Sequence, residues 1–164
     1  MLRPTTAKIR KALFDILGDI QGLSFLDLFA GSGGVGIEAF KKGAKKVVFV
    51  EIDRHNIQII RKTVSSLKND ASFEIIAVDV FVAIKQFNRE GKKYEIIFLD
   101  PPYYEDLVKK TLQILSCYDI VAPNGLVIAQ HYYKEMVPQR CANLELLKQK
   151  RYSESCLSFY YKLD

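Results

Sequence analysis

A carboxylate, two prolines and an aromatic ring stand side by side in the segment Asp100-Pro101-Pro102-Tyr103. The prolines fix φ and remove backbone donors, so the preceding apolar run should end here and leave the Pro101 carbonyl available to a ligand. That carbonyl and Asp100 could hold both N–H groups of an exocyclic base amine, favouring the pyramidal nitrogen that attacks a methyl group. Tyr103 could stack on the base, an interaction worth roughly 1–3 kcal/mol. The segment therefore predicts an amine-methylating site, the alternative being a turn that ends a strand over a core tyrosine.

A glycine-rich loop is the second candidate site. From Asp27 to Gly36 the chain reads D-L-F-A-G-S-G-G-V-G, which contains G-x-G-x-x-G. Glycines there permit a tight turn and the close approach of a ligand. Glu51 follows the next expected strand, where a carboxylate can bind a pair of ribose hydroxyls. These features fit a nicotinamide dinucleotide and S-adenosylmethionine about equally.

Asp27 separates the two ligands. A dinucleotide would bring a pyrophosphate toward this carboxylate and be repelled. S-adenosylmethionine instead brings an ammonium and a sulfonium, so we expect it to be the cofactor, the alternative being a glycine turn with a surface aspartate. The cofactor-binding residues predicted in this region are Asp27, Phe29, Ala30, Gly31, Ser32 and Gly33.

The apolar pattern predicts an α/β fold that positions both segments. Continuous apolar runs such as V-V-F-V and E-I-I-F-L indicate strands covered on both faces, as in a parallel sheet between helices. The expected strands are 24–29, 47–51, 73–78, 94–99 and 126–130, and the expected helices are 7–17, 34–42, 54–67, 80–89 and 105–116. Segments 144–152 and 157–163 are separated only by residues 153–156, too few for a crossover helix, so they should form an antiparallel hairpin. The Asp100 segment then lies at the carboxyl edge of the sheet, where open α/β sheets bind ligands.

Several stretches together resemble one methyltransferase family. They are L-R-P-T-T at residues 2–6, K-I-R-K-A-L-F-D-I-L in the first helix, F-L-D-L-F-A-G-S-G-G-V-G-I-E-A over the glycine loop, and I-I-F-L-D-P-P-Y. The combination resembles the bacterial 16S ribosomal RNA guanine-N2 methyltransferase family over nearly the whole chain. This resemblance implies one domain, 1–164, with a Rossmann-like class I methyltransferase fold: a mostly parallel seven-stranded sheet, a C-terminal antiparallel hairpin and helices on both faces.

The resemblance also implies further cofactor contacts. Glu51 and Ile52 match the acid that binds the ribose and the apolar neighbour that packs against the adenine. Asp79 and Val80 fall where the adenine amino group is bound in these enzymes. Asp79 fits a plain helix cap as well, and the two roles can coexist.

The N-terminus departs from the family pattern. Members usually begin with a basic β-hairpin before the R-P-T segment, whereas this sequence begins almost at that segment. By analogy, Arg3 and Thr5 would lie over the cofactor mouth with the helix of residues 1–20, or would only cap that helix. RNA binding would then depend on scattered lysines and on the C-terminal hairpin.

The implied reaction is methylation of the N2 amine of a guanine in 16S ribosomal RNA, with small-subunit particles as the expected substrate. An adenine-N6 or protein-glutamine methyltransferase is the alternative within the same class, since both also carry D-P-P-Y. An NAD-linked oxidoreductase and a non-catalytic RNA-binding module are alternatives from other classes. Cytosine C5 methylation is disfavoured because the chain lacks a cysteine nucleophile after proline.

Composition adds only weak constraints. The net charge of +5 and pI near 9.0 suit a polyanionic partner, although the basic residues are scattered. No apolar run approaches the roughly 18 residues of a membrane span and no signal peptide is evident, so we expect a cytoplasmic monomer without a membrane partner. Cys117, Cys141 and Cys156 show no metal-binding or disulfide spacing and are expected to be buried or half-buried thiols without a metal. We assign His55 and His131 to structure or surface.

Overall fold

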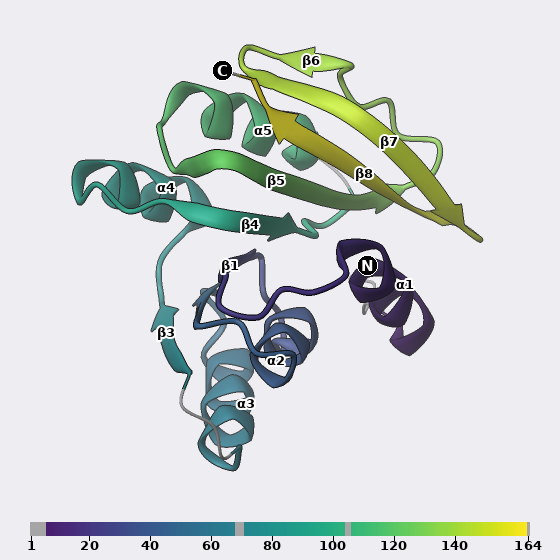
Figure 1. The fold of residues 1–164 in the computed structure, drawn as a ribbon. Helices are drawn as coiled ribbons and strands as arrows, with labels where there is room; N and C mark the ends of the chain where they lie inside the picture. The colour runs from purple at the N-terminus through teal and green to yellow at the C-terminus, as the bar shows by residue number, and fades with distance from the viewer. Residues whose placement is uncertain (1–5, 68–70, 104–105, 164) are drawn as a thin grey trace.

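Five apolar segments form the parallel part of a sheet. The computed structural model describes residues 6–67, 71–103 and 106–163. The parallel strands are β1 (Ser24–Leu28), β2 (Lys46–Val50), β3 (Ser72–Ile76), β4 (Tyr94–Leu99) and β5 (Val121–Tyr132). With the antiparallel strands that follow, the described residues give the order β3-β2-β1-β4-β5-β8-β7-β6 (Figure 1). The predicted α/β fold is confirmed.

Helices cover both faces of this sheet (Figure 1). They are α1 (Ala7–Leu17), α2 (Gly34–Lys41), α3 (Arg54–Ser65), α4 (Val80–Arg89) and α5 (Leu107–Cys117). Side chains of neighbouring strand residues point to opposite faces, so Phe98 joins the core beside α1, α2 and α3, whereas Leu99 joins the core beside α4 and α5. Both faces being apolar explains why the strands read as continuous hydrophobic runs.

Polar side chains fix where three of the helices begin. Thr6 accepts a hydrogen bond from the Ile9 N–H at the start of α1, and Asp53 accepts one from Asn56 at the start of α3. Asp79 accepts from Phe81 at 2.8 Å at the start of α4. Each satisfies an amide that has no partner within its own helix.

The C-terminal strands run antiparallel. Strand β8 (Ser155–Lys162) pairs with both β5 and β7 (Leu144–Tyr152). The hairpin turn is shorter than expected, because Ser153 adopts a left-handed φ of 58° and Tyr152 pairs directly with Ser155. An eighth strand, β6 (Arg140–Cys141), was not predicted, since its two residues are too short to give a periodic signal.

Strand β5 is longer than the expected segment 126–130. Its first half contains Pro123-Asn124-Gly125, which reads as a turn in the sequence. The structure accommodates these residues as an irregularity between the pairs Tyr94–Val121 and Ile96–Leu126, with Asn124 at a φ of 63°. A bulge of this kind lets proline and asparagine stand within a strand.

The strand order reverses between β1 and β4, which makes this position a topological switch point of the sheet. From β1 the chain moves outward through β2 and β3, and then returns to the other side of β1 as β4. The loops that leave β1 and β4 therefore diverge at the carboxyl edge, which is where open α/β sheets bind ligands. Within the described ranges, no helix is both long and apolar enough to cross a bilayer.

Candidate active site

The glycine loop leaves β1 in a strained conformation. Phe29, Gly31 and Gly33 have positive φ values of 57°, 59° and 85°. A left-handed φ is costly for phenylalanine, and such strain clusters at functional sites. The Ala30 N–H donates to the Val50 carbonyl at 3.0 Å, which ties the loop to the end of β2. Ser32 is exposed at the tip of the loop.

Asp27 lies beneath this loop and is 2% exposed, so it is not a surface aspartate. Its Oδ2 accepts the Gly36 N–H at 2.9 Å, within the first turn of α2. Burial raises the pKa of Asp27 well above its ordinary value, the Gly36 hydrogen bond opposes this rise, and the charges of Asp100 and Glu51 add to it. A cation bound beside Asp27 would stabilise the charged form of this carboxyl and lower its pKa.

Glu51 joins the glycine loop to the start of α3. Its Oε1 accepts the Gly31 N–H at 2.6 Å and its Oε2 accepts the Asp53 N–H at 2.9 Å. A carboxylate oxygen has two acceptor positions, so each can still receive a ribose hydroxyl. Glu51 therefore holds the loop in place and presents acceptors at the sheet edge.

Ile52, Asp79 and Val80 differ in how far their side chains are accessible to a ligand. Ile52 is 67% exposed, so its apolar side chain is available to pack on a flat ring. Asp79 is exposed and acts as the α4 cap, so that reading is confirmed, while a contact with adenine stays a prediction. Val80 is 6% exposed and its side chain packs in the core, which leaves its backbone for any ligand contact.

The D-P-P-Y segment stands beside the glycine loop. Leu28 pairs with Leu99, so Phe29 and Asp100 are the first residues after the ends of two adjacent strands. Asp100 is half-buried and close enough to Asp27 for its charge to raise the pKa of Asp27. Pro101 is buried, whereas Pro102 and Tyr103 are partly exposed. Register thus brings together residues from two motifs that lie about 70 positions apart in the chain.

An aromatic cluster that the sequence did not predict adjoins Tyr103. The Tyr103 ring lies edge-to-face on Tyr132, with centroids 5.6 Å apart, and Tyr132 lies 5.0 Å from Tyr133. Tyr132 is the last residue of β5, whose end was expected two residues earlier. The sequence signal was the pair of tyrosines after His131, which a longer strand would have placed at the same edge.

Other sequence expectations have mixed outcomes. Arg3 and Thr5 lie outside the described residues. His131 is buried and its Nε2 lies 2.6 Å from the Ser158 hydroxyl, which agrees with a structural role. Cys117 is exposed, so the expectation of a buried or half-buried thiol is wrong for this residue, which ends α5.

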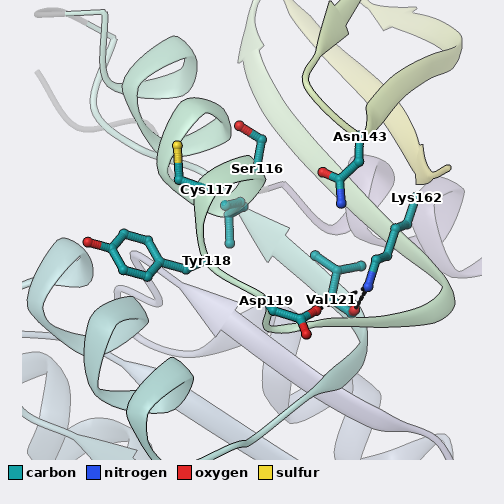
Figure 2. A pocket seen from close by; sticks show the side chains of 8 residues that line it. Ser116, Cys117, Tyr118, Asp119, Val121, Asn143 and Lys162 are labelled. Carbon is teal, nitrogen blue, oxygen red and sulfur yellow. Dashed lines mark hydrogen bonds and ion pairs between the residues drawn. The ribbon is translucent and has the colours of Figure 1, made fainter. Parts of the chain in front are cut away.

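A small pocket lies at the opposite, amino edge of the sheet (Figure 2). It has a volume of about 130 Å³ and lies between the end of α5, the start of β5, Asn143 and Lys162. The Lys162 ammonium donates to the Val121 carbonyl at 2.9 Å and occupies one side of the pocket. None of the predicted cofactor or catalytic residues lines it.

The family model described as Conserved hypothetical protein 95 matches residues 1–161. The chain belongs to this family. Ribosomal RNA small subunit methyltransferase D of Buchnera aphidicola is 36% identical over 137 residues, covering 83% of this chain and 70% of that protein. The family resemblance predicted from the sequence is thereby confirmed.

Solved structures agree with the family assignment. A conserved hypothetical protein from Streptococcus pyogenes superposes with a TM-score of 0.85 at 29% identity, covering 93% of this chain and 94% of that one. An RNA methyltransferase from Salinibacter ruber, solved with S-adenosyl-L-homocysteine, superposes with a TM-score of 0.73 at 17% identity, covering 99% and 95%. The second likeness establishes the fold alone, and that fold is the predicted Rossmann-like methyltransferase fold.

Proposed function

We propose that this protein methylates the exocyclic N2 amine of a guanine in 16S ribosomal RNA, using S-adenosylmethionine. Membership of the family makes it an S-adenosylmethionine-dependent ribosomal RNA methyltransferase. The choice of guanine N2 comes from the sequence resemblance. The observation that carries the proposal is the meeting of the glycine loop and the Asp100 segment at the one switch point of the sheet.

The residues around the glycine loop suit this cofactor. Asp27 is a buried carboxylate with a raised pKa, which a ligand ammonium would stabilise in its charged form. Glu51 offers acceptors for ribose hydroxyls, and Ile52 offers an exposed apolar face for adenine. A dinucleotide pyrophosphate would instead meet three carboxylates, those of Asp27, Glu51 and Asp100. When bound, S-adenosylmethionine supplies an electrophilic methyl group on sulfur.

The Asp100 segment suits the amine. In this proposal the Asp100 carboxylate and the Pro101 carbonyl accept hydrogen bonds from the two N–H groups of the guanine N2 amine. These two hydrogen bonds favour a pyramidal nitrogen, whose lone pair then points toward the methyl group. The nitrogen forms the new N–C bond as the C–S bond breaks, and its extra proton then leaves to Asp100 or water. Asp100 need not be a strong base, because the nitrogen becomes acidic only as the methyl group arrives.

Small-subunit particles are the proposed form of the substrate. The net charge of +5 is modest and the basic residues are scattered, so binding to naked RNA should be weak and strongly dependent on salt. A preformed surface of RNA and protein would add contacts that a flexible RNA lacks. We propose that the protein acts on it as a monomer in the cytoplasm.

Transfer of a labelled methyl group tests the proposal. Small-subunit particles, free 16S RNA and duplex DNA are incubated with the protein and labelled cofactor, and the nucleosides are then separated. We expect N2-methylguanosine, with particles as the best substrate and DNA inert. N6-methyladenosine would instead assign the protein to the alternative class, and labelled protein without labelled RNA would indicate glutamine methylation.

A further inference from the structure

Two tyrosines lie at the end of β5, next to the proposed catalytic residues. Strand β5 ends at Tyr132, and Tyr133 follows it. Both rings are only half-buried. The Tyr133 N–H donates to the Glu154 carbonyl at 2.9 Å, which ties this segment to the turn between β7 and β8. The rings are therefore held in place by the backbone of two separate parts of the chain.

Arg151 lies on the second of these rings. The centre of its guanidinium is 3.7 Å from the Tyr133 ring centroid, a close stacking distance. Its Nε–H donates to the Ser153 carbonyl at 2.8 Å, so the orientation of the guanidinium is fixed by the hairpin turn. The two Nη groups carry four further N–H donors in a planar array, a geometry that matches a phosphate. The side chain is exposed.

These groups form a continuous path from the catalytic segment. The Tyr103 ring contacts Tyr132, Tyr132 contacts Tyr133, and Tyr133 contacts Arg151. We call Tyr132, Tyr133 and Arg151 the aromatic platform. Aromatic rings beside a guanidinium are the combination that binds single-stranded nucleic acid, since bases stack on the rings while the cation meets the backbone.

The surrounding charge favours an RNA chain on this side. Arg151 is exposed near the end of β7, and Lys134, which is also exposed, lies 5.7 Å from the Tyr133 ring centroid. Glu154 is also exposed in the adjoining turn, so the attraction is local rather than that of a broad basic surface. A few phosphates next to the target base are the contacts that this distribution can make.

We propose that the aromatic platform binds the nucleotides next to the target base, with bases on Tyr132 and Tyr133 and a phosphate on Arg151. This inference rests on the proposed function, because it assumes an RNA substrate. It assigns the platform to positioning the substrate, while the bond-making contacts remain with Asp100 and Pro101. The platform therefore affects RNA affinity and leaves cofactor binding unchanged.

Three variants of the full chain and one control test the platform. Arg151→Ala removes the cation, Tyr133→Ala removes the ring, and Tyr133→Phe keeps the ring without its hydroxyl. Arg89→Ala is the matched control, because Arg89 is an exposed arginine in the last turn of α4, at the amino edge of the sheet. Binding of a fluorescently labelled single-stranded RNA of mixed sequence is measured across salt concentrations, together with kcat and KM on small-subunit particles and cofactor affinity by calorimetry.

We expect Arg151→Ala and Tyr133→Ala each to weaken RNA binding and raise KM about tenfold, with kcat and cofactor affinity nearly unchanged. Arg151→Ala should also reduce the slope of log affinity against log salt by about one. Tyr133→Phe and Arg89→Ala should stay within about twofold of the unaltered protein. Arg151 is exposed, so its variant should fold even if Tyr133→Ala does not.

The outcomes separate the platform from the proposed function. RNA binding by a folded Arg151→Ala variant that equals the unaltered protein, or that falls no further than Arg89→Ala, would overturn the platform. Oligonucleotide binding that weakens as expected, in a protein that methylates no RNA, would support the platform and overturn the proposed function. An unaltered protein that neither binds the oligonucleotide nor methylates particles would overturn both.

Discussion

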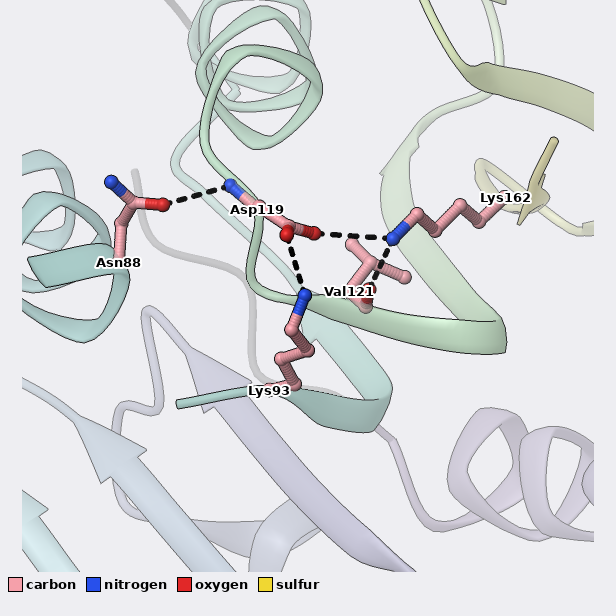
Figure 3. A network of polar contacts seen from close by, with 5 residues as sticks. All are labelled: Asn88, Lys93, Asp119, Val121 and Lys162. Atoms are coloured by element: carbon pink, nitrogen blue, oxygen red, sulfur yellow. Dashed lines mark hydrogen bonds and ion pairs between the residues drawn. The ribbon is translucent and has the colours of Figure 1, made fainter. Parts of the chain in front are cut away.

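The two edges of the sheet each carry an aspartate, and the pKa values of the two aspartates are shifted in opposite directions. At the amino edge, Asp119 accepts hydrogen bonds from the ammonium groups of Lys93 and Lys162, and its own N–H donates to Asn88 (Figure 3). These ammonium groups lower the pKa of Asp119. At the carboxyl edge, Asp27 accepts a hydrogen bond from a backbone N–H, and its pKa is raised by burial and further by the charges of Asp100 and Glu51.

This difference separates a structural network from a binding site. At the amino edge, Asp119 forms ion pairs with Lys93 and Lys162, and a hydrogen bond from its N–H to Asn88 links this network to α4. Like charges at the carboxyl edge are unfavourable in the ligand-free protein and become favourable when a cation arrives. The carboxyl edge, where the pKa of Asp27 is raised, is the one that we assign to the cofactor and the amine.

The largest expected effect comes from removing a carboxylate from each edge in turn. Asp100→Ala should lower methyl transfer by about 100-fold or more, because one of the two acceptors on the amine is lost, while cofactor affinity changes little. Asp119→Ala, the same chemical change at the amino edge, should leave activity intact. Steady-state methyl transfer and calorimetry measure the two quantities. Equal activity losses in both variants would remove the distinction between the edges.

Cofactor affinity should depend on the two other carboxylates of the carboxyl edge. Asp27→Ala and Glu51→Ala should each weaken S-adenosylmethionine binding by about 1.5–3 kcal/mol, the value of a hydrogen bond to a charged group. Calorimetry on the folded variants measures this loss directly. Unchanged affinity in both would show that the cofactor does not bind beside these residues.

The raised pKa of Asp27 also predicts a pH dependence. The folded protein favours the protonated form, so Asp27 makes folding less favourable as pH rises from its ordinary value through its raised value. A cationic ligand binds the ionised form better, so cofactor affinity should rise with pH across the same range, with proton release on binding. Calorimetry in buffers of different ionisation enthalpy detects that release. The Asp27→Asn variant should show neither effect.

Replacing Gly36 of α2 by alanine should disturb the packing beneath the glycine loop, whereas the same replacement at Gly34 should not. A Cβ at Gly36 would overlap the Phe49 ring and lie 3.0 Å from Asp27 Oδ2, whereas one at Gly34 would meet only the movable end of Arg10. We expect Gly36→Ala to cost about 1–3 kcal/mol of stability. Gly34→Ala should be neutral or slightly stabilising. Denaturant unfolding compares them, and equal stabilities would contradict the close packing.

The smallest effect is expected at the amino edge. Asp119 is 62% exposed, so solvent screens its ion pairs, and Asp119→Ala should cost only about 0.2–1 kcal/mol. Its pKa is lowered, so this contribution is present above the ordinary carboxyl pKa and is lost as pH falls through the lowered value. Unfolding at neutral and acidic pH, with and without high salt, measures it. If Asp119→Ala lowers stability as much in high salt as in low salt, then contacts other than screened surface ion pairs contribute.

Local sequence signals were sufficient for most of the fold. Continuous apolar runs identified the parallel strands, and Asp79, which the sequence offered as a helix cap, stands where α4 begins. The strand β6 and the full length of β5 were not predicted. The length of β5 was hidden by Pro123-Asn124-Gly125, which forms a turn in most contexts, and β6 is too short to show a period.

Both motifs could be identified from the sequence alone, because glycine permits the tight turn of the loop and proline fixes φ wherever these residues occur. It also determined the family, through stretches that span the chain. Which side chains contact one another, in contrast, depends on how the strands pair and pack. Strand register brought Asp100 beside the loop of Asp27, and the extension of β5 together with the hairpin turn brought Tyr133 under Arg151. Contacts between distant residues depend on pairing and packing summed over the whole sheet, which no local pattern records.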